Sequence, residues 1–286
     1  MRIPPLVLLN SFVVLVMLSI GLRVERGELL EALRNRRLFV RTLVANCLVV
    51  PALGFLLVSI FPLTPDVSLG ILLLAAIPGT PVALQFTRMA KTRLAFAAVM
   101  IFVLSLVSIA VTPLALEVIP RTAERSERPI LNLTLTILLY LAAPLFAGSW
   151  LARRLPRFVP RLVLPLELIA SAVFLYLMWV TRLARREALL AIAGRGTILA
   201  MFLLLVLSMV LGWFMGGPDR ESRRVLATST GMRSVIVVLY IARYCFPKTN
   251  VYMIPIVYLT LMVPTNLLFH LTFTVWNRSR PATAGV

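Results

Sequence analysis

The sequence contains few of the side chains that build metal centres, disulfide frameworks and catalytic pairs. Its 286 residues include one histidine, two cysteines and 11 acidic residues. His270 alone cannot form a metal site, and the sequence has no zinc-spaced cysteine and histidine set and no phosphate-binding glycine loop. Cys47 and Cys245 lie in or next to apolar runs, where cysteine acts as a small buried hydrophobe. We therefore predict no cofactor, no metal and no catalytic residue, and we do not expect an enzyme.

Charged residues are also scarce. They make up 14% of the chain against 60% hydrophobic residues, and the mean hydropathy is +0.96. A soluble domain is about a quarter charged, so this composition indicates an integral membrane protein with the lipid bilayer around it. The net charge of +18 would favour nucleic-acid binding in a soluble chain. Here the basic residues stand in clusters between apolar runs, so nucleic acid is excluded as a partner.

Apolar runs of membrane-spanning length follow one another along the whole chain. A helix needs roughly 20 apolar residues to cross a bilayer. The first run is too long for the apolar region of a secretory signal and is interpreted as a span. The sequence thus predicts an all-α polytopic membrane protein with one membrane domain over residues 1–286. The nine spans are expected near 4–22, 39–61, 66–88, 93–119, 130–152, 159–181, 197–217, 222–243 and 251–276.

The basic residues predict the orientation of these spans. Most of the lysines and arginines fall in the loop after the first span and in the later loops on the same side. Loops rich in these residues face the cytoplasm. We therefore expect the N-terminus outside and the C-terminus in the cytoplasm, in the inner (plasma) membrane of a bacterium. Arg233 belongs to neither set of loops, because it lies within a span.

Two spans carry helix-breaking sequences near their middles. The third contains Ile77-Pro78-Gly79-Thr80-Pro81, and the eighth contains Thr228-Ser229-Thr230-Gly231-Met232-Arg233-Ser234. A helix broken at membrane depth leaves backbone groups free to bind solutes, and breaks in both halves of a transporter indicate its binding site. The alternative is a simple packing kink. The predicted helix-breaking residues are Pro78, Gly79, Pro81 and Gly231.

Arg233 is the strongest single candidate for a functional residue. An arginine near the bilayer centre costs roughly 2.5–3.5 kcal/mol on insertion scales, so it requires water, an acidic partner or an anionic ligand. Glu167 is the acidic residue clearly inside another span, and it is predicted as a salt-bridge partner or a proton carrier. For His270 we expect an interfacial position near the cytoplasmic end of the last span. The predicted substrate-binding residues are Asn46, Thr80, Thr228, Ser229, Thr230, Arg233 and Ser234, although an isolated asparagine such as Asn46 also bonds across helices.

Several short motifs resemble the bile acid:sodium symporter family. They are Met17 to Leu22 ahead of the basic loop, Asn46 to Pro51, the Pro78-Gly79 break, and Arg223-Arg224 leading into Thr230-Gly231-Met232. The resemblance implies two inverted repeats, here about 1–119 and 130–276 with a short cytoplasmic tail at 277–286. It also implies a panel domain, a core domain and two broken helices that cross at mid-membrane. The nine spans are similar to the layout of animal members.

The sodium ligands that the resemblance implies are largely missing. The positions expected to ligate sodium fall on apolar residues in the first half and on Ser229, Arg233 and Ser234 in the second; the apolar ones are Ala83, Leu84, Ala97 and Ile101. Only the amide on the second span remains, as Asn46 in place of glutamine. A hard cation requires oxygen ligands, so we expect the fold to persist without sodium coupling. Arg233 either replaces sodium structurally or holds an anionic substrate.

The expected function is a secondary transporter of a small organic anion that works by alternating access and is not coupled to sodium. Two alternatives remain: a sodium-coupled symporter with remodelled ion sites, and a membrane receptor or scaffold that no longer transports. Flux in vesicles separates transport from receptor binding, and the effect of sodium on that flux separates the two transporters.

Overall fold

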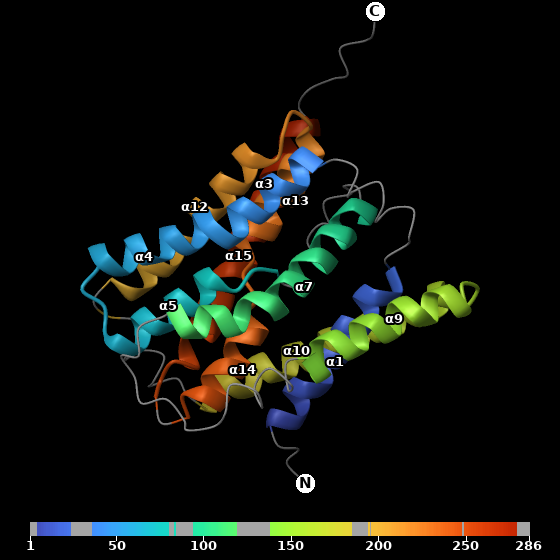
Figure 1. Cartoon of the computed structure of the whole chain (residues 1–286), viewed down its shortest axis with the longest axis horizontal. Coiled ribbons are helices and arrows are strands. Elements are labelled where there is room, and N and C mark those ends of the chain that lie inside the picture. The colour runs from blue at the N-terminus through green and yellow to red at the C-terminus, as the bar shows by residue number, and fades with distance from the viewer. Residues whose placement is uncertain are drawn as a thin grey trace, which may run out of the picture.

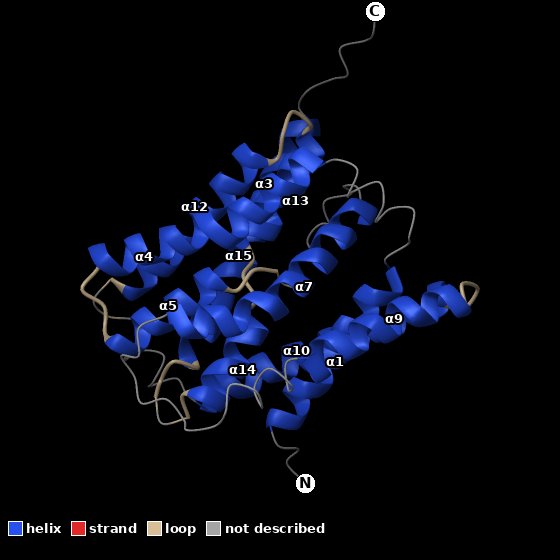
Figure 2. Ribbon diagram, viewed as in Figure 1, coloured by secondary structure: helices blue, strands red, loops and turns tan. Residues whose placement is uncertain are grey.

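The computed structural model describes residues 5–23, 36–79, 83, 94–118, 138–184, 194, 196–247 and 249–278, and every regular element within them is helical (Figure 2). Each predicted span contains at least part of one helix. The elements, in which η marks a π-helical turn, are α1 (Pro5–Arg23), α3 (Arg36–Val44), η1 (Ala45–Val49), α4 (Val50–Ile60), α5 (Pro65–Ala76), α7 (Leu94–Val118), η2 (Leu138–Ala142), α9 (Ala143–Arg154), α10 (Val159–Ala184), α12 (Thr197–Met215), α13 (Arg220–Gly231), α14 (Val235–Cys245) and α15 (Met253–Arg278).

Several of these helices are long and apolar enough to cross a membrane. Among the described residues, four stretches meet both conditions: Arg36–Ile60, Thr197–Met215, Arg220–Cys245 and Met253–Phe273. The Arg220–Cys245 stretch differs from the others because 94% of its apolar window is buried inside the protein, against 28% for Arg36–Ile60. A helix pair that is buried on all sides occupies the interior of a bundle. The broken span α13–α14 is therefore surrounded by protein, not by lipid.

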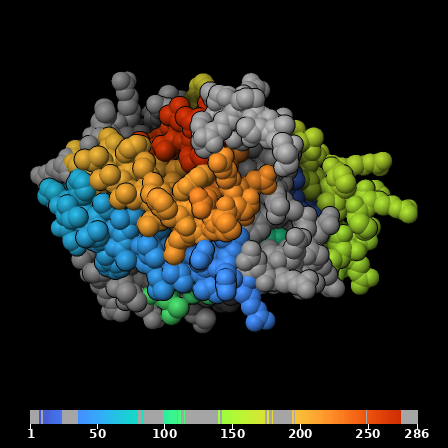
Figure 3. All heavy atoms as spheres, turned by 90° about the horizontal axis from the view of Figure 1, so that it is seen from above, coloured from blue at the N-terminus to red at the C-terminus, as the bar shows by residue number. Residues whose placement is uncertain are grey.

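Helix α1 packs against both α9 and α10, and the three helices form one group (Figure 1). Glycines lie where α1 crosses α9, because a Cβ atom on Gly21 would collide with the backbone of Leu145 and one on Gly148 would collide with the backbone of Leu18. Close backbone approach through small residues is typical of helix pairs in membranes. Helix α10 contacts the other side of α1 through a polar cluster around Glu167. Figure 3 shows α9 at one end of the molecule, away from α4 and α12.

The second group contains the two broken spans. Helix α12 packs closely on α13, where Gly212 lies against the backbone of Leu226 and Ala227. Helix α5 contacts α4, α14 and α15, and its residues from Leu69 to Ala75 are buried almost without exception. The two groups meet at α14 and α1, where the Tyr240 hydroxyl donates to Asn10 Oδ1 at 2.5 Å. The broken helices thus lie inside the second group, next to its contact with the first.

Large apolar side chains cover the outer surfaces of both groups. Trp150, Leu168 and Trp179 on α9 and α10, and Phe214 on α12, are each more than half exposed. Exposed apolar surface of this extent is costly in water but not in lipid. The surface of the protein therefore fits the bilayer that its composition predicts.

Candidate functional site at the meeting of the broken helices

The ends of the two broken spans lie in contact. Helix α5 ends at Ala76, α13 ends at Gly231, and α14 begins at Val235 after an irregular segment of three residues. The backbone N–H of Ser234 donates to the carbonyl of Ile77 at 3.4 Å and joins the two breaks directly. Helix α5 contacts α14 and α15 (Figure 1). Free helix ends of both spans are therefore gathered in one place within the membrane domain.

Pro78 and Gly79 shape the first break. Ile77 is extended, with φ −100° and ψ 103°, and Gly79 has a φ of +78°. Glycine adopts this left-handed conformation without steric cost. A Cβ atom at Gly79 would also lie 2.9 Å from the backbone carbon of Leu104 on α7, which leaves no room for a larger residue. Thr80 and Pro81, predicted as a binding residue and a helix breaker, lie outside the described residues.

Arg233 is fully buried at this junction, with 0% of its surface exposed. Its Nε donates to the carbonyl of Leu74 at 2.9 Å, and its Nη1 donates to the side-chain oxygen of Asn46 at 2.8 Å. Its Nη2 donates to the backbone carbonyls of Asn46, at 3.3 Å, and of Ala75. A guanidinium has five N–H groups, so four of the five are used by the protein itself.

Prolines explain why two of these carbonyls are free to accept. In an α-helix the carbonyl of Leu74 would accept from the N–H of residue 78, but residue 78 is proline and has none. In the π-helical turn η1 the N–H of Val50 donates to Ala45, so the carbonyl of Asn46 would accept from residue 51, which is also proline. Pro78 and Pro51 each leave one carbonyl without its helical donor. Arg233 donates to both.

The position of Arg233 also suits its charge. Ala75 is the penultimate residue of α5, and the last four carbonyls of a helix lack partners within the helix. These carbonyls carry the negative end of the helix dipole, which favours a cation. The guanidinium is therefore a fixed positive charge that joins the end of α5 to the turn η1 and to the second break.

Asn46 connects the same turn to α13. Its side-chain nitrogen donates to the carbonyl of Thr42 at 3.0 Å and to the hydroxyl of Thr230 at 3.2 Å, while its oxygen accepts from Arg233. On the other side of the break, the Tyr258 hydroxyl donates to the carbonyl of Gly231 at 2.7 Å. Asn46, Thr230 and Arg233, three of the predicted site residues, thus form one hydrogen-bonded network. No pattern in the sequence indicates Tyr258, since a single tyrosine in an apolar helix is not distinctive.

The other predicted residues of the second break are also buried, but they face different partners. The Ser229 hydroxyl donates to the carbonyl of Leu226 at 3.3 Å, one turn earlier in its own helix. Ser234 is 1% exposed. The Thr228 hydroxyl lies 3.1 Å from Nε2 of His270 on α15. The interfacial position predicted for His270 is wrong, because its ring is buried and hydrogen-bonded to α13.

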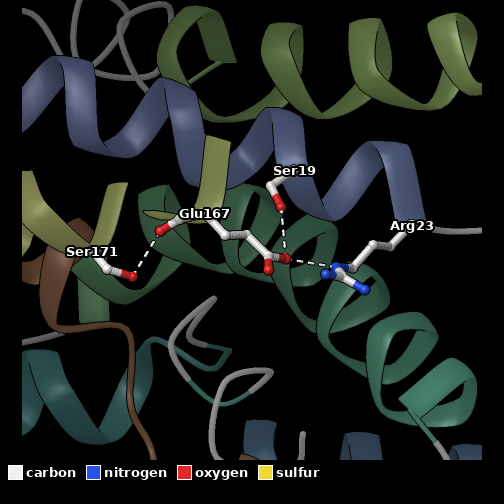
Figure 4. Close-up of polar contacts among 4 residues, drawn as sticks. All are labelled: Ser19, Arg23, Glu167 and Ser171. Atoms are coloured by element: carbon white, nitrogen blue, oxygen red, sulfur yellow. Dashed lines mark hydrogen bonds and ion pairs between the residues drawn. The ribbon is translucent and has the colours of Figure 1, made fainter. Parts of the chain in front are cut away.

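Glu167 does not contact Arg233 in this structure. Figure 4 shows its carboxylate between α10 and α1, where Oε1 accepts from the Ser19 hydroxyl at 3.0 Å and from Arg23 Nε at 2.6 Å. The Ser171 hydroxyl donates to the backbone carbonyl of Glu167 at 2.7 Å. The ion pair with Arg23 is partly buried and links α1 to α10. Of the two roles predicted for Glu167, the geometry fits the salt bridge, with a different arginine.

Two of the positions implied for sodium carry apolar side chains in the described part of the chain. Ala83 and Ile101 are fully buried and apolar. Leu84 and the side chain of Ala97 lie outside the described part of the chain. Within the described ranges, no group of three or more histidine, cysteine or acidic side chains is arranged to hold a metal ion. The carbonyl oxygens of Leu74, Ala75 and Asn46 accept from Arg233.

Comparison with known proteins places the chain in a transporter family. The model of the Sodium Bile acid symporter family matches residues 11–192, which include α1, the first break and α10. The second break and Arg233 lie beyond the matched residues. A search of curated proteins found no match. Because the family model covers more than half of the sequence, the chain belongs to the sodium bile acid symporter family.

Proposed function

We propose that this protein is a secondary transporter of a small organic anion that works by alternating access without sodium coupling. Its family is a transporter family, and its apolar helices fit a bilayer. The meeting of two broken spans within the protein is an arrangement used by transporters to bind solutes near the membrane midplane. In this proposal α1, α9 and α10 form the panel domain, and the helices around the two breaks form the core domain.

The contacts of Arg233 are the observation that carries the absence of sodium coupling. A sodium ion bound here would require several oxygen ligands. The carbonyl oxygens of Leu74, Ala75 and Asn46 instead accept from the guanidinium. A fixed cation supplies the positive charge at the end of α5 at all times, so the crossing is held together without an ion from solution. In the proposal, Arg233 takes the place of the coupling ion and does not release its carbonyls to the substrate.

The preference for an anion follows from the charge of the core. Arg233 is buried at the second break and Arg224 is buried near the other end of α13, while Glu167 is paired with Arg23 in the other group of helices. The first N–H groups of α14, which begins beside Arg233, add the positive end of a helix dipole. A net positive interior favours an anionic solute. Thr80, Thr228, Ser229 and Ser234 are proposed to contribute polar contacts.

The distribution of lysine and arginine over the loops supports the proposed orientation of the protein in the membrane. The N-terminus is proposed to lie outside and the C-terminus in the cytoplasm of the inner membrane, with inverted repeats near 1–119 and 130–276. This arrangement places Arg224 toward the cytoplasmic end of α13 and Tyr240 toward the outer side. The contact of Tyr240 with Asn10 then closes the outer half of the interface between core and panel.

Counterflow in reconstituted vesicles tests the proposal. A thermal-shift screen of carboxylates first identifies a ligand that stabilises the purified protein. Vesicles loaded with that ligand should then accumulate the labelled form at the same rate in sodium chloride and in choline chloride. Uptake that requires sodium would overturn the proposal, whereas binding without flux would indicate a receptor.

A further inference from the structure

Arg224 on α13 is a second buried arginine, and two of its three nitrogens have no hydrogen-bond partner among the described residues. The residue is 7% exposed, and its Nε and Nη2 atoms are buried without a hydrogen-bond partner in the part of the chain that the structure describes. Buried arginine nitrogens are normally hydrogen-bonded, because a buried N–H group without an acceptor is unfavourable. The two nitrogens therefore indicate a partner that binds in another step of the protein's cycle.

The two nitrogens form one of the forks of the guanidinium. Nε–H and one N–H of Nη2 point in the same direction in the plane of the group, and the two together match the two oxygens of a carboxylate. The third nitrogen is not part of this fork. The geometry of the unsatisfied atoms thus specifies a planar anion that accepts two parallel hydrogen bonds.

The neighbours of Arg224 hold the guanidinium and leave this fork free. The centre of the Phe273 ring on α15 lies 5.1 Å from the guanidinium carbon, a cation–π contact that uses none of the N–H groups of the fork. His270, one turn before Phe273, lies within electrostatic range of Arg224 and contacts Thr228, one turn after Arg224 on α13. The side chains of Arg224 and Thr228 on α13 and of His270 on α15 are therefore close to one another between the two helices.

Aromatic rings surround the same place. Trp213 on α12 packs against Phe269 and Phe273 on α15, with ring centroids 6.3 Å and 5.0 Å apart. Phe269 and Phe273 are 5.2 Å apart. An acid with an apolar body can place its carboxylate on Arg224 and its apolar part against these rings.

The adjacent Arg223 provides an internal comparison. Its Nε donates to the carbonyl of Gly217 at 2.5 Å, and its guanidinium carbon lies 5.9 Å from the centre of the Trp213 ring. Arg223 has the same side chain in the same turn of α13, but its fork already has a partner in the protein. The lack of partners at Arg224 is therefore a property of its site and not of the helix.

We propose that Arg224, with Thr228 and His270, forms a carboxylate-binding site between α13 and α15, suited to an organic acid with an apolar body. The inference rests on the proposed transport of an organic anion and names the residue that receives its charge. The site lies about 10 Å from the second break along α13. Because the fork is buried in this structure, the carboxylate enters when the surface over α13 and α15 opens.

The Nε–Hε signal of Arg224 reports directly on this fork. The protein is labelled with nitrogen-15 in lipid nanodiscs, and the signal is assigned as the one that disappears in Arg224→Lys. Choline acetate is then titrated, with acetamide as the uncharged probe of the same shape. We expect a saturable downfield shift with acetate and none with acetamide. The Arg223 signal, assigned with Arg223→Lys, should move little, because its Nε already donates to Gly217.

Each outcome decides the question. The site is overturned if acetate shifts the Arg223 signal at lower concentration than the Arg224 signal, or if the two signals shift equally. For the carboxylate found in the thermal-shift screen, Arg224→Lys should weaken binding by about tenfold or more, since loss of a charge-assisted hydrogen bond is worth at least that factor, and Arg223→Lys should not. If the protein transports but acetate does not shift the Arg224 signal, only the binding site is rejected. If acetate binds at Arg224 but no counterflow occurs, only transport is rejected.

Discussion

Two buried arginines lie near opposite ends of α13, and their guanidinium groups are in opposite states. Arg233, just after the end of the helix, makes four hydrogen bonds to residues of the protein. Arg224, near the start of the helix, has two buried nitrogens without a partner. Both cost free energy to bury. Four hydrogen bonds offset that cost at Arg233, whereas Arg224 has the electrostatic attraction of Glu221 but no acceptor at these two nitrogens among the described residues.

The difference separates two uses of the same side chain. A guanidinium that donates to three backbone carbonyls and one side-chain amide is a permanent connection between helices. A guanidinium with a free, correctly shaped fork can bind and release an anion. Burial alone therefore does not identify a binding residue in this membrane domain. The distribution of hydrogen-bond partners does.

The largest effect is expected from Arg233→Ala. The change leaves the carbonyls of Leu74, Ala75 and Asn46 without a donor inside the protein. We expect a loss of about 3–5 kcal/mol of stability, the usual cost of breaking a buried charged network. Thermal unfolding in detergent measures the loss, with Arg223→Ala as the matched control. An unfolding temperature equal to that of the wild type would show that Arg233 is not a structural connection.

Asn46→Leu should have the next largest effect. It removes the acceptor of Arg233 Nη1 and the donor to Thr230, so we expect a loss of about 2 kcal/mol. Asn266 is the matched control, because it is another fully buried asparagine whose Oδ1 has no donor in the described part of the chain. Asn266→Leu should therefore cost less in the same unfolding measurement. Equal losses would remove the special role assigned to the contact between Asn46 and Arg233.

A rescue experiment tests the role assigned to Pro78. In the Arg233→Ala background, Pro78→Ala restores an N–H that can donate to the carbonyl of Leu74. We expect this second change to recover about 1 kcal/mol, the typical net value of one hydrogen bond. In the wild-type background the same change should not stabilise, because Arg233 already donates there. A double-mutant cycle measures the coupling, and additive effects would contradict the explanation.

The smallest effect on stability is expected from Arg224→Met. Methionine keeps contact with Phe273 and removes a cation without hydrogen-bond partners at two nitrogens, so unfolding should change by less than about 1 kcal/mol in either direction. Carboxylate binding should nevertheless be lost in the thermal-shift measurement. A large loss of stability from this substitution would indicate that Arg224 is structural like Arg233.

The sequence predicted the parts of this comparison that depend on local patterns. Apolar length located the helices, and Pro78, Gly79 and Gly231 located the ends of α5 and α13. Arg233 was conspicuous because a charge in the middle of a span has few stabilising environments. Its acceptors were not predictable, since Asn46 and Leu74 lie far away in the sequence and the orphaned carbonyls arise from the fold.

Arg224 and Glu167 show the limits of such patterns. Arg224 stands beside Arg220 and Arg223, so counting basic residues assigned it to a loop, whereas the packing of α13 on α12 buries it. Glu167 was the natural partner for Arg233 as an acidic residue inside a span. It pairs with Arg23 instead because α1 packs against α10, a tertiary contact that composition does not encode.

The most direct test of the central claim, that Arg233 occupies the place of a coupling cation, is the thermal stability of the wild-type protein at increasing sodium concentration. An ion that binds only the folded state raises stability by RT ln(1 + [ion]/Kd), which keeps increasing as the ion concentration exceeds Kd. Choline chloride at equal ionic strength serves as the reference. The account predicts the same unfolding temperature in both salts at every concentration. An unfolding temperature that rises with sodium chloride and not with choline chloride would contradict it.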